Sequence, residues 1–390
     1  MSRLGPDQRE TELPADHDRL DDHDRAADTD DRPFDWRLAG AGLLVVLLLG
    51  AAAHLLTEQV PAWTKGTGFG SVAKSIEFPV YAIALGLLGN VILTALGLRD
   101  RLSAGFRTEF LIKTGLVLLG ASINFAVIVK AAGPAIAQAV LLITIVFFFT
   151  WWVAGKLGVE PRLRALLASA VSICGVSAAI AAAGAVKAKT EDLAYTASLV
   201  IVFALPAIFL LPWLSGLLGL SPAVTGAWIG GNIDTTAAVT AAGTIAGEEP
   251  LQIATIVKVT QNALLGVAAV ALTAYFALRV ERTENAARPT FGQFWARFPK
   301  FVLGFLAASV IATVFAQSVD PAQAKAAVGV ANDLRTWFLT FAFVSIGLEF
   351  RAAAIRHAGW RPVAVFGAAT GVNLVVGLGL ALLLFSSFTF

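Results

Sequence analysis

The chain has 390 residues, of which 57% are hydrophobic and 14% are charged, and its mean hydropathy is +0.74. These values predict an all-α polytopic membrane protein and exclude a soluble domain as the main part of the chain. The formal net charge is only +2, and Cys174 is the single cysteine, so no intrachain disulfide can form.

Residues 1–36 differ from the rest, because they hold twelve acidic residues against five arginines. High charge with few apolar residues predicts a disordered, cytoplasmic acidic tail, and the tail lacks the apolar stretch of a signal peptide. His17 and His23 lie in two copies of DHDR, for which a solvated tail is favoured over a divalent-metal site. Residues 37–390 are predicted to form the transmembrane domain.

About eleven segments have the length and apolar character of spanning helices. Their ranges are 37–56, 76–98, 109–129, 132–155, 163–186, 192–214, 223–245, 250–278, 298–317, 328–350 and 360–387. With the N-terminus inside, alternating loops place 17 Lys and Arg residues inside and 6 outside. This excess predicts a multi-pass protein of the cytoplasmic membrane with a cytoplasmic N-terminus.

Small residues dominate the segment ALLASAVSICGVSAAIAAAGAV at 165–186, which predicts a central, tightly packed helix. We expect this helix to break at Cys174, Gly175 and Ser177. A break would expose backbone N–H groups and a helix N-terminus, which together suit an anion. An unbroken helix is the alternative.

A carboxylate stands in the middle of the apolar segment 223–245, in the string GGNIDTTAAVTAAG. Intramembrane acids usually face a protein interior or a water-filled cavity. Asp234, together with Asn232, Thr235 and Thr236, therefore predicts a second broken helix that binds a substrate or ion. A buried Asp bonded to a neighbouring helix is the alternative.

The helix at 250–278 carries a polar stripe, since Thr255, Lys258, Gln261 and Asn262 follow helical spacing. We expect Lys258 to face a cavity rather than to extend toward the interface. It would then pair with Asp234, or with an anionic substrate. Lys258, Gln261 and Asn262 complete the predicted site.

Three weaker candidates are Ser122, Asn124 and Glu349. The first two suit hydrogen bonds between helices, and Glu349 suits an interfacial ion pair with Arg351. Glu109 and Lys113 have the spacing of a local pair. The sequence offers no metal-ligand cluster, phosphate loop, nucleophile triad or nucleic-acid surface, so no metal, no cofactor and no enzymatic activity are expected.

Internal similarity suggests two inverted repeats. LVLLGASINF at 116–125 resembles FAFVSIGLEF at 341–350, in helices predicted to run in opposite directions. SAAIAAAGAV at 177–186 matches TAAVTAAGTI at 236–245 more closely. Those two helices are predicted to run the same way, so this second match is discounted.

Three strings in order, ICGVSAAIAAAGAVKAKTEDLAYTASLV, WIGGNIDTTAAVTAAG and GEEPLQIATIVKVTQ, resemble the bacterial YeiH family of putative sulfate exporters. The likeness covers about residues 70–385. It implies an inverted-repeat fold shared with the bile acid:sodium symporter superfamily and an inner-membrane location.

This sequence departs from the family pattern at several site positions. The pattern has a His at Asp234, an acidic residue at Thr235, and basic residues at Gln261 and near Ser122, whereas Lys258 is retained. The loss of positive groups argues against sulfate for this member but not against the fold.

We therefore expect a secondary transporter of a small anion, such as sulfate, a sulfonate or an organic anion, coupled to H⁺ or Na⁺. Two alternatives stay open, namely a cation or proton exchanger that uses Asp234 and a non-transporting membrane sensor or scaffold. The expected partners are a small anionic solute and the lipid bilayer, with no nucleic acid. The sequence does not determine the oligomeric state, and a homodimer stays open.

Overall fold

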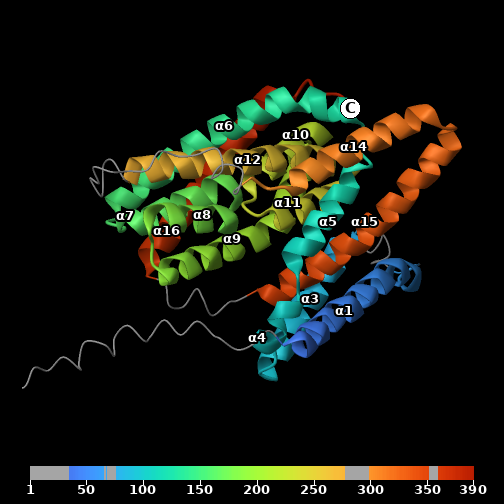
Figure 1. Cartoon of the computed structure of the whole chain (residues 1–390), viewed down its shortest axis with the longest axis horizontal. Coiled ribbons are helices and arrows are strands. Elements are labelled where there is room, and N and C mark those ends of the chain that lie inside the picture. The colour runs from blue at the N-terminus through green and yellow to red at the C-terminus, as the bar shows by residue number, and fades with distance from the viewer. Residues whose placement is uncertain (1–34, 66, 68–75, 277–297, 351–358) are drawn as a thin grey trace, which may run out of the picture. The chain divides into compact units, whose positions relative to one another are not determined.

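The computed structural model describes residues 35–65, 67, 76–276, 298–350 and 359–390, and every regular element in these ranges is helical (Figure 1). The predicted acidic tail and Arg351 lie outside the described residues, apart from the last two residues of the tail. Within the described ranges, seven helices are long and apolar enough to cross a membrane. They are α1 (Trp36–Trp63), α3 (Phe78–Ala95), α6 (Phe125–Lys156), α9 (Thr190–Leu217), α12 (Glu248–Tyr275), α14 (Phe301–Ser318) and α16 (Trp360–Phe385).

The remaining elements are shorter or more polar. They are α4 (Arg99–Leu102), η3 (Ser103–Gly105), α5 (Thr108–Gly120), α7 (Pro161–Ser169), the π-helix η4 (Ala170–Cys174), α8 (Val176–Val186), α10 (Pro222–Asn232), α11 (Thr236–Ala246) and α15 (Pro321–Glu349). The segment Leu38–Phe390 forms one unit, to which the following description applies.

The predicted span 109–129 is not one helix, because α5 ends at Gly120 and α6 begins at Phe125. Asn124 causes the new start, since its extended backbone and its side chain, which accepts a hydrogen bond from the Ala126 amide, make an N-cap. The chain then continues as a 32-residue helix through the range predicted as 132–155.

The predicted break in segment 163–186 is confirmed, but the segment does not cross the protein. The π-helix η4 ends at Cys174, and α8 begins at Val176, with Gly175 between them. Ala165 and Leu166 near the start of α7 pack in one cluster with Ala183 and Val186 at the end of α8. The two arms therefore lie side by side as a helical hairpin, hairpin 1 (Pro161–Val186), whose base lies at one end of the protein.

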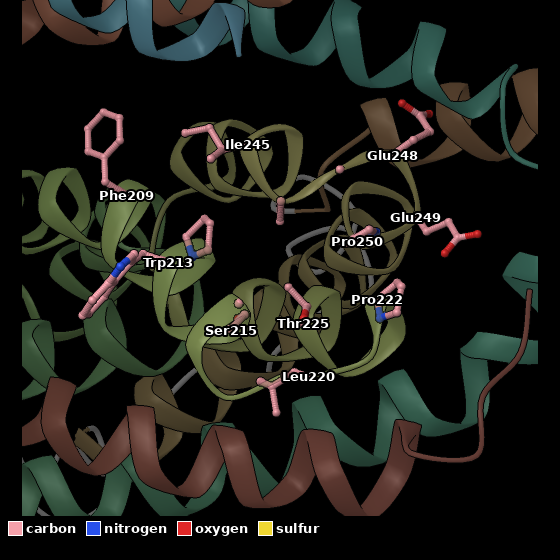
Figure 2. Close-up of a pocket in the computed structure, with 15 residues that line it drawn as sticks. Phe209, Trp213, Ser215, Leu220, Pro222, Thr225, Ile245, Glu248, Glu249 and Pro250 are labelled. Atoms are coloured by element: carbon pink, nitrogen blue, oxygen red, sulfur yellow. The ribbon is translucent and has the colours of Figure 1, made fainter. Parts of the chain in front are cut away.

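The segment 223–245 is also a hairpin, hairpin 2 (Pro222–Ala246), rather than the crossing helix that was predicted. Figure 2 shows Pro222 and Thr225 of α10 around one pocket with Ile245 and Pro250. Ile245 lies at the end of α11, and Pro250 lies at the start of α12. Both arms of hairpin 2 thus begin and end together, and the chain reverses at residues 233–235.

Helix α12 orders the two hairpins, because its first half packs against hairpin 2 and its second half against hairpin 1. At the start of α12, a Cβ on Gly226 would meet Pro250, and a Cβ on Gly243 would meet Leu251. The Asn262 side chain bonds to Thr236, at the first turn of α11. Further on, Cys174 and Ala178 pack with Leu265 and Ala268. The hairpins therefore enter from opposite ends, and their tips meet beside the middle of α12.

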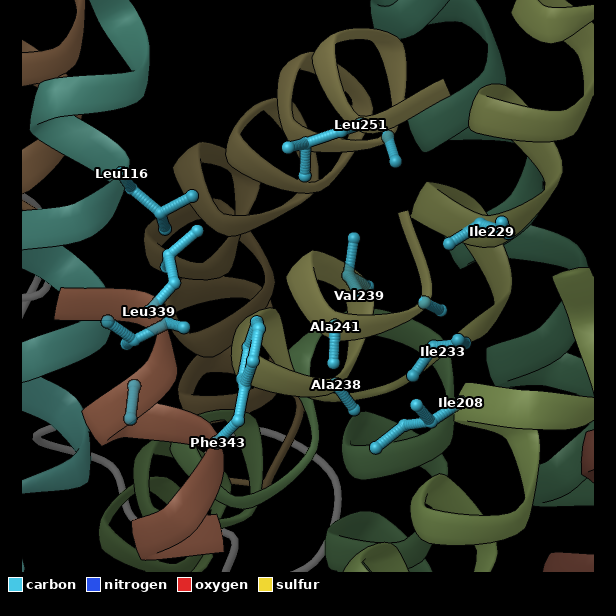
Figure 3. Packing of buried hydrophobic residues seen from close by; sticks show 14 of the residues in the cluster. Leu116, Ile208, Ile229, Ile233, Ala238, Val239, Ala241, Leu251, Leu339 and Phe343 are labelled. Carbon is cyan, nitrogen blue, oxygen red and sulfur yellow. The ribbon is translucent and has the colours of Figure 1, made fainter. Parts of the chain in front are cut away.

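A second group of helices, α3, α5, α14 and α15, packs beside the hairpins. Glycines allow close approach here, since a Cβ on Gly86 would lie 2.2 Å from the Val344 carbonyl oxygen. Figure 3 shows Leu339 and Phe343 of α15 in one hydrophobic cluster with Ala238 and Val239 of α11. Arg335 of α15 also makes two hydrogen bonds to the Glu248 carboxylate of α12, at 2.8 and 3.0 Å.

Candidate functional site

The candidate site begins at the contact between the two hairpin tips. Gly175 has φ 66° and ψ −120°, a conformation that side chains disfavour. A Cβ at this position would lie 3.3 Å from Thr235 Cγ2, 3.4 Å from Asp234 Cβ and 2.7 Å from Val200 Cγ1. Glycine thus allows both the reversal of hairpin 1 and the approach of hairpin 2.

The reversals leave main-chain carbonyl groups without helical donors, and α12 supplies two side chains to satisfy them. The Lys258 ammonium donates to the Ile173 carbonyl of hairpin 1 at 2.9 Å and to Gln261 Oε1 at 2.7 Å. Gln261 in turn donates to the Gly231 carbonyl of hairpin 2 at 3.2 Å. Lys258 and Gln261 therefore join the two tips.

A second link comes from α16 on another side of the tips. The Asn373 amide donates to the Val171 carbonyl at 3.4 Å and to the Asn232 carbonyl at 3.2 Å. Gln138 of α6 supports the same hairpin by donating to the Ala227 carbonyl at 2.8 Å. Three helices thus fix the tips through hydrogen bonds to the backbone.

Asp234 lies between the tips, and its residue is 6% exposed. Within the described residues its carboxyl group accepts no hydrogen bond and forms no ion pair, although its charge interacts with that of Lys258. Asp234 and Lys258 are therefore close enough for their charges to interact, but they do not form a salt bridge. Lys258 is 1% exposed and bonded to the backbone, so the prediction that it faces a cavity is wrong.

A cavity of about 500 Å³ reaches the tips from the side of α5, α9 and α15. The first turns of α8 and α11 both form its wall, through Val176 and Ser177 and through Thr236 and Ala237. The first amide groups of a helix lack intrahelical acceptors and carry a partial positive charge. The cavity therefore has two helix N-termini in one wall.

The structure brings about half of the predicted site residues to this cavity. Those that line it are Cys174, Ser177, Thr235, Thr236, Asn262 and Glu349. Gly175, Asn232, Asp234, Lys258 and Gln261 lie in or behind the tips instead.

Ser122 and Asn124, the other two weaker candidates, do not line this cavity. The Ser122 hydroxyl donates to Asn332, and Asn124 caps α6. Both side chains thus stabilise helices, as the alternative reading of these residues allowed.

Sequence reasoning missed several residues that the structure places at the site. Thr108, Glu109 and Lys113 line the cavity, with Glu109 and Lys113 in the local ion pair that their spacing indicates. Gln138 and Asn373 were missed as tip supports, although each is a polar residue inside an apolar helix, which is a usable signal. Among the described residues, no three His, Cys, Asp or Glu side chains gather as a metal site.

Comparison with known proteins identifies relatives. The family model described as Conserved hypothetical protein 698 matches residues 41–366. A UPF0324 membrane protein of Rhodopirellula baltica is 36% identical over 354 residues, which are 88% of this chain and 63% of that protein. A UPF0324 membrane protein of Nitratidesulfovibrio vulgaris is 37% identical, over 88% of this chain and 59% of its own length.

The chain thus spans less than two thirds of these two relatives. Another UPF0324 membrane protein of N. vulgaris, 31% identical, is matched over 93% of its length and 89% of this chain. No solved structure matches the chain significantly. Because the family model and these relatives cover most of the sequence, the chain is a multi-pass membrane protein that belongs to the Conserved hypothetical protein 698 family, whose curated members are named UPF0324 membrane proteins.

Proposed function

We propose that this protein is a secondary transporter that carries a small anion across the cytoplasmic membrane, coupled to H⁺ or Na⁺. The observation that carries the proposal is the pair of helix N-termini, of α8 and α11, in the wall of one cavity at the meeting point of two hairpins. Discontinuous helices whose N-termini point at an anionic substrate are a recurring device of secondary transporters.

The proposed membrane topology has nine crossing helices, which are the seven long apolar helices together with α5 and α15, and two re-entrant hairpins that enter from opposite sides. Hairpin 1 begins and ends at one membrane surface, which moves Lys187 and Lys189 to the side of Lys156. The proposed inner loops then carry nineteen Lys and Arg residues against four outside. This larger excess supports a cytoplasmic N-terminus.

The two hairpins also support an inverted repeat. Helix α8 runs along α12 in the same direction, whereas α11 runs against it. The discounted match of SAAIAAAGAV with TAAVTAAGTI therefore joins two helices of opposite direction, as inversion requires. An inverted repeat agrees with the resemblance to the YeiH family and to the bile acid:sodium symporter superfamily.

Asp234 is the proposed coupling residue. Its charge lies at the tips, beside the N-terminal turn of α11 where the anion would bind. A carboxylate there repels an anion, and a proton or a sodium ion on Asp234 removes that repulsion. Binding of the anion and binding of the coupling ion then favour each other.

A cation or proton exchanger is the second candidate, favoured by one specific observation. The Asp234 carboxyl group accepts no hydrogen bond from the described residues. Its oxygens are therefore available to bind a cation or a proton. In this version Asp234 binds the transported ion, and the cavity conducts it without an anion.

The test uses the purified chain in proteoliposomes, with radiolabelled sulfate, a sulfonate or a carboxylate under imposed pH and Na⁺ gradients. We expect anion uptake that a gradient drives in the wild type, and loss of this coupling in Asp234→Asn. Glu191→Gln, an exposed acid at the start of α9, is the control and should behave as wild type.

The two candidates give different results in these vesicles. Flux of H⁺ or Na⁺ that needs no anion supports the exchanger. Anion flux in Asp234→Asn that responds to the gradient as in the wild type rules out Asp234 as the coupling residue.

A further inference from the structure

We propose that Arg335 and Glu248 form the outer gate of the transport cavity, and that this structure is the inward-facing state, in which the gate is closed. The inference rests on the proposed function and topology, and it names the contact that keeps the hairpin tips from the outer solution. Three features of the described residues support it: the extent of the cavity, the packing beyond its end, and an ion pair at the outer edge of that packing.

The cavity follows only the inner ends of α5, α14 and α15. In the proposed topology α5 and α14 begin, and α15 ends, at the cytoplasmic side. The lining residues of α5 lie within its first six positions, up to Ile112 and Lys113. Those of α15 are Ile346 and Glu349 in its last turn, and Phe301 is the first residue of α14. The cavity therefore extends from the hairpin tips toward the cytoplasmic side.

One turn further along α5 and α15, packed side chains replace the cavity. Leu116 of α5 and Phe343 of α15 are both fully buried. Leu339 lies another turn along α15 and is 1% exposed. Figure 3 shows it in one apolar cluster with Val239 of α11, and α11 and α15 are in contact. This cluster fills the space between hairpin 2 and the second helix group on the outer side of the tips.

Arg335 lies one turn beyond Leu339 and meets the base of hairpin 2. Its guanidinium donates to both carboxylate oxygens of Glu248, at 2.8 and 3.0 Å. Glu248 opens α12 and stands two residues after the end of α11. Within the described ranges, every other ion pair joins residues of a single helix. The pair Arg335–Glu248 must therefore break if the two groups of helices separate on their outer side.

The exposure of this pair suits a contact that opens and closes repeatedly. The Arg335 side chain is 11% exposed, whereas that of Glu248 is 49% exposed. Two parallel hydrogen bonds fix the closed position. A half-exposed carboxylate regains water when the pair parts, so the pair favours the closed gate by a factor of up to about five. Binding of the solute and of the coupling ion can overcome a preference of this size.

The test measures from which side of the membrane the hairpin tips can be reached. Ser177, an exposed residue of the cavity wall, supplies the reporter thiol in the parent variant Cys174→Ser with Ser177→Cys. A maleimide that does not cross membranes is applied to spheroplasts and to inverted vesicles. We expect labelling at least about 10-fold faster in inverted vesicles, because the outward-facing state is the minor one.

The gate is then opened by substitution in this parent. Glu248→Gln should raise the rate of labelling in spheroplasts about five-fold. Glu248→Arg, which places two cations together, should raise it further. Adding Arg335→Glu to Glu248→Arg restores a pair of opposite charges and should return slow labelling. Glu249→Gln is the matched control, since Figure 2 shows this exposed acid beside Glu248, and it should label like the parent.

A reversible cross-link tests the gate without weakening the fold. Glu248→Cys and Arg335→Cys are combined in Cys174→Ser and joined by a bifunctional methanethiosulfonate, which a reducing agent removes. We expect solute flux in proteoliposomes to stop on cross-linking and to return on reduction. Undiminished flux through the cross-linked protein overturns the gate. Slow labelling in spheroplasts of both Glu248→Gln and Glu248→Arg also overturns it, and equal labelling of the parent from both sides overturns the inward-facing assignment.

Failure of the transport proposal gives a different result. If no solute moves in proteoliposomes before cross-linking, the transport proposal fails, and labelling still decides whether Arg335 and Glu248 control access to the tips. If solutes move while the labelling rates do not respond to the ion pair, the transporter stands and only the gate fails.

Discussion

Lys258 shows how one residue can support the candidate site without lining its cavity. Its ammonium donates to Ile173 and Gln261, and Gln261 donates to Gly231, so one lysine on α12 connects both hairpins. Both acceptors of Lys258 are buried, and each would remain unpaired if the lysine were removed.

We therefore expect Lys258→Met to lower the free energy of unfolding by about 3 kcal/mol. Binding of anions should weaken as well, because the tips themselves shift. Denaturant titration of the purified protein and calorimetry measure the two effects, with the exposed Lys325→Met as control. Unchanged stability with selective loss of anion binding would mean that Lys258 touches the anion directly.

The polar stripe on α12 could be predicted from the sequence, but the partners of its members could not. Helical spacing places Lys258, Gln261 and Asn262 on one side of the helix. The structure divides this side, since Asn262 lines the cavity and Lys258 lies against the backbone of hairpin 1. Which neighbour meets each residue depends on helices distant in sequence, and periodicity does not contain that information.

At the scale of elements, the two reversals depend on different residues. Hairpin 1 turns at Gly175, whose backbone angles exclude most side chains. Hairpin 2 turns through Ile233, Asp234 and Thr235, and the Thr235 hydroxyl caps the returning helix α11. The glycine is therefore the position at which a small change tests the tip geometry.

Gly175→Ala should cost about 1–3 kcal/mol of stability because its conformation is strained for alanine. The added methyl group would also press on Val200 and separate the two tips. Gly184→Ala is the matched control, since it adds the same methyl group inside α8 where no atom lies within 4 Å. That control should be neutral or stabilising by up to about 1 kcal/mol. Thermal denaturation and solute flux should separate the two variants, and equal effects would contradict a special role for Gly175.

The breaks in both hairpins could be predicted, whereas their return to the starting side could not. A glycine, small residues or an intramembrane carboxylate weaken a helix locally, and those signals are in the sequence at Cys174–Ser177 and at Asp234. The direction after a break is set by packing, here of α7 on α8 and of both hairpins on α12. Loop charges give only a weak signal of this return, because the loop 215–222 has none and only Lys187 and Lys189 change sides.

At the scale of the whole unit Leu38–Phe390, the two hairpins together leave the side of the membrane on which the chain ends unchanged in the proposed topology. In the proposed topology each hairpin replaces one predicted crossing by a return, so the helices before hairpin 1 and after hairpin 2 keep their predicted directions. In that topology only α9, between the hairpins, has the opposite direction. The overall charge asymmetry is therefore compatible with eleven crossings as well as with the proposed nine.

Labelling of single cysteines from one side of the membrane separates the two topologies. In a Cys174→Ser background, Lys156→Cys and Lys189→Cys flank hairpin 1, and Leu218→Cys and Glu249→Cys flank hairpin 2; all four positions are exposed. A maleimide that does not cross membranes should label the first pair only in inverted vesicles and the second pair only in spheroplasts. A crossing helix at 163–186 would instead place Lys156 and Lys189 on opposite sides. Two helix N-termini reach one cavity because the hairpins enter from opposite surfaces. Labelling of Lys156→Cys and Lys189→Cys from opposite sides would therefore contradict both the hairpin and the proposed anion site.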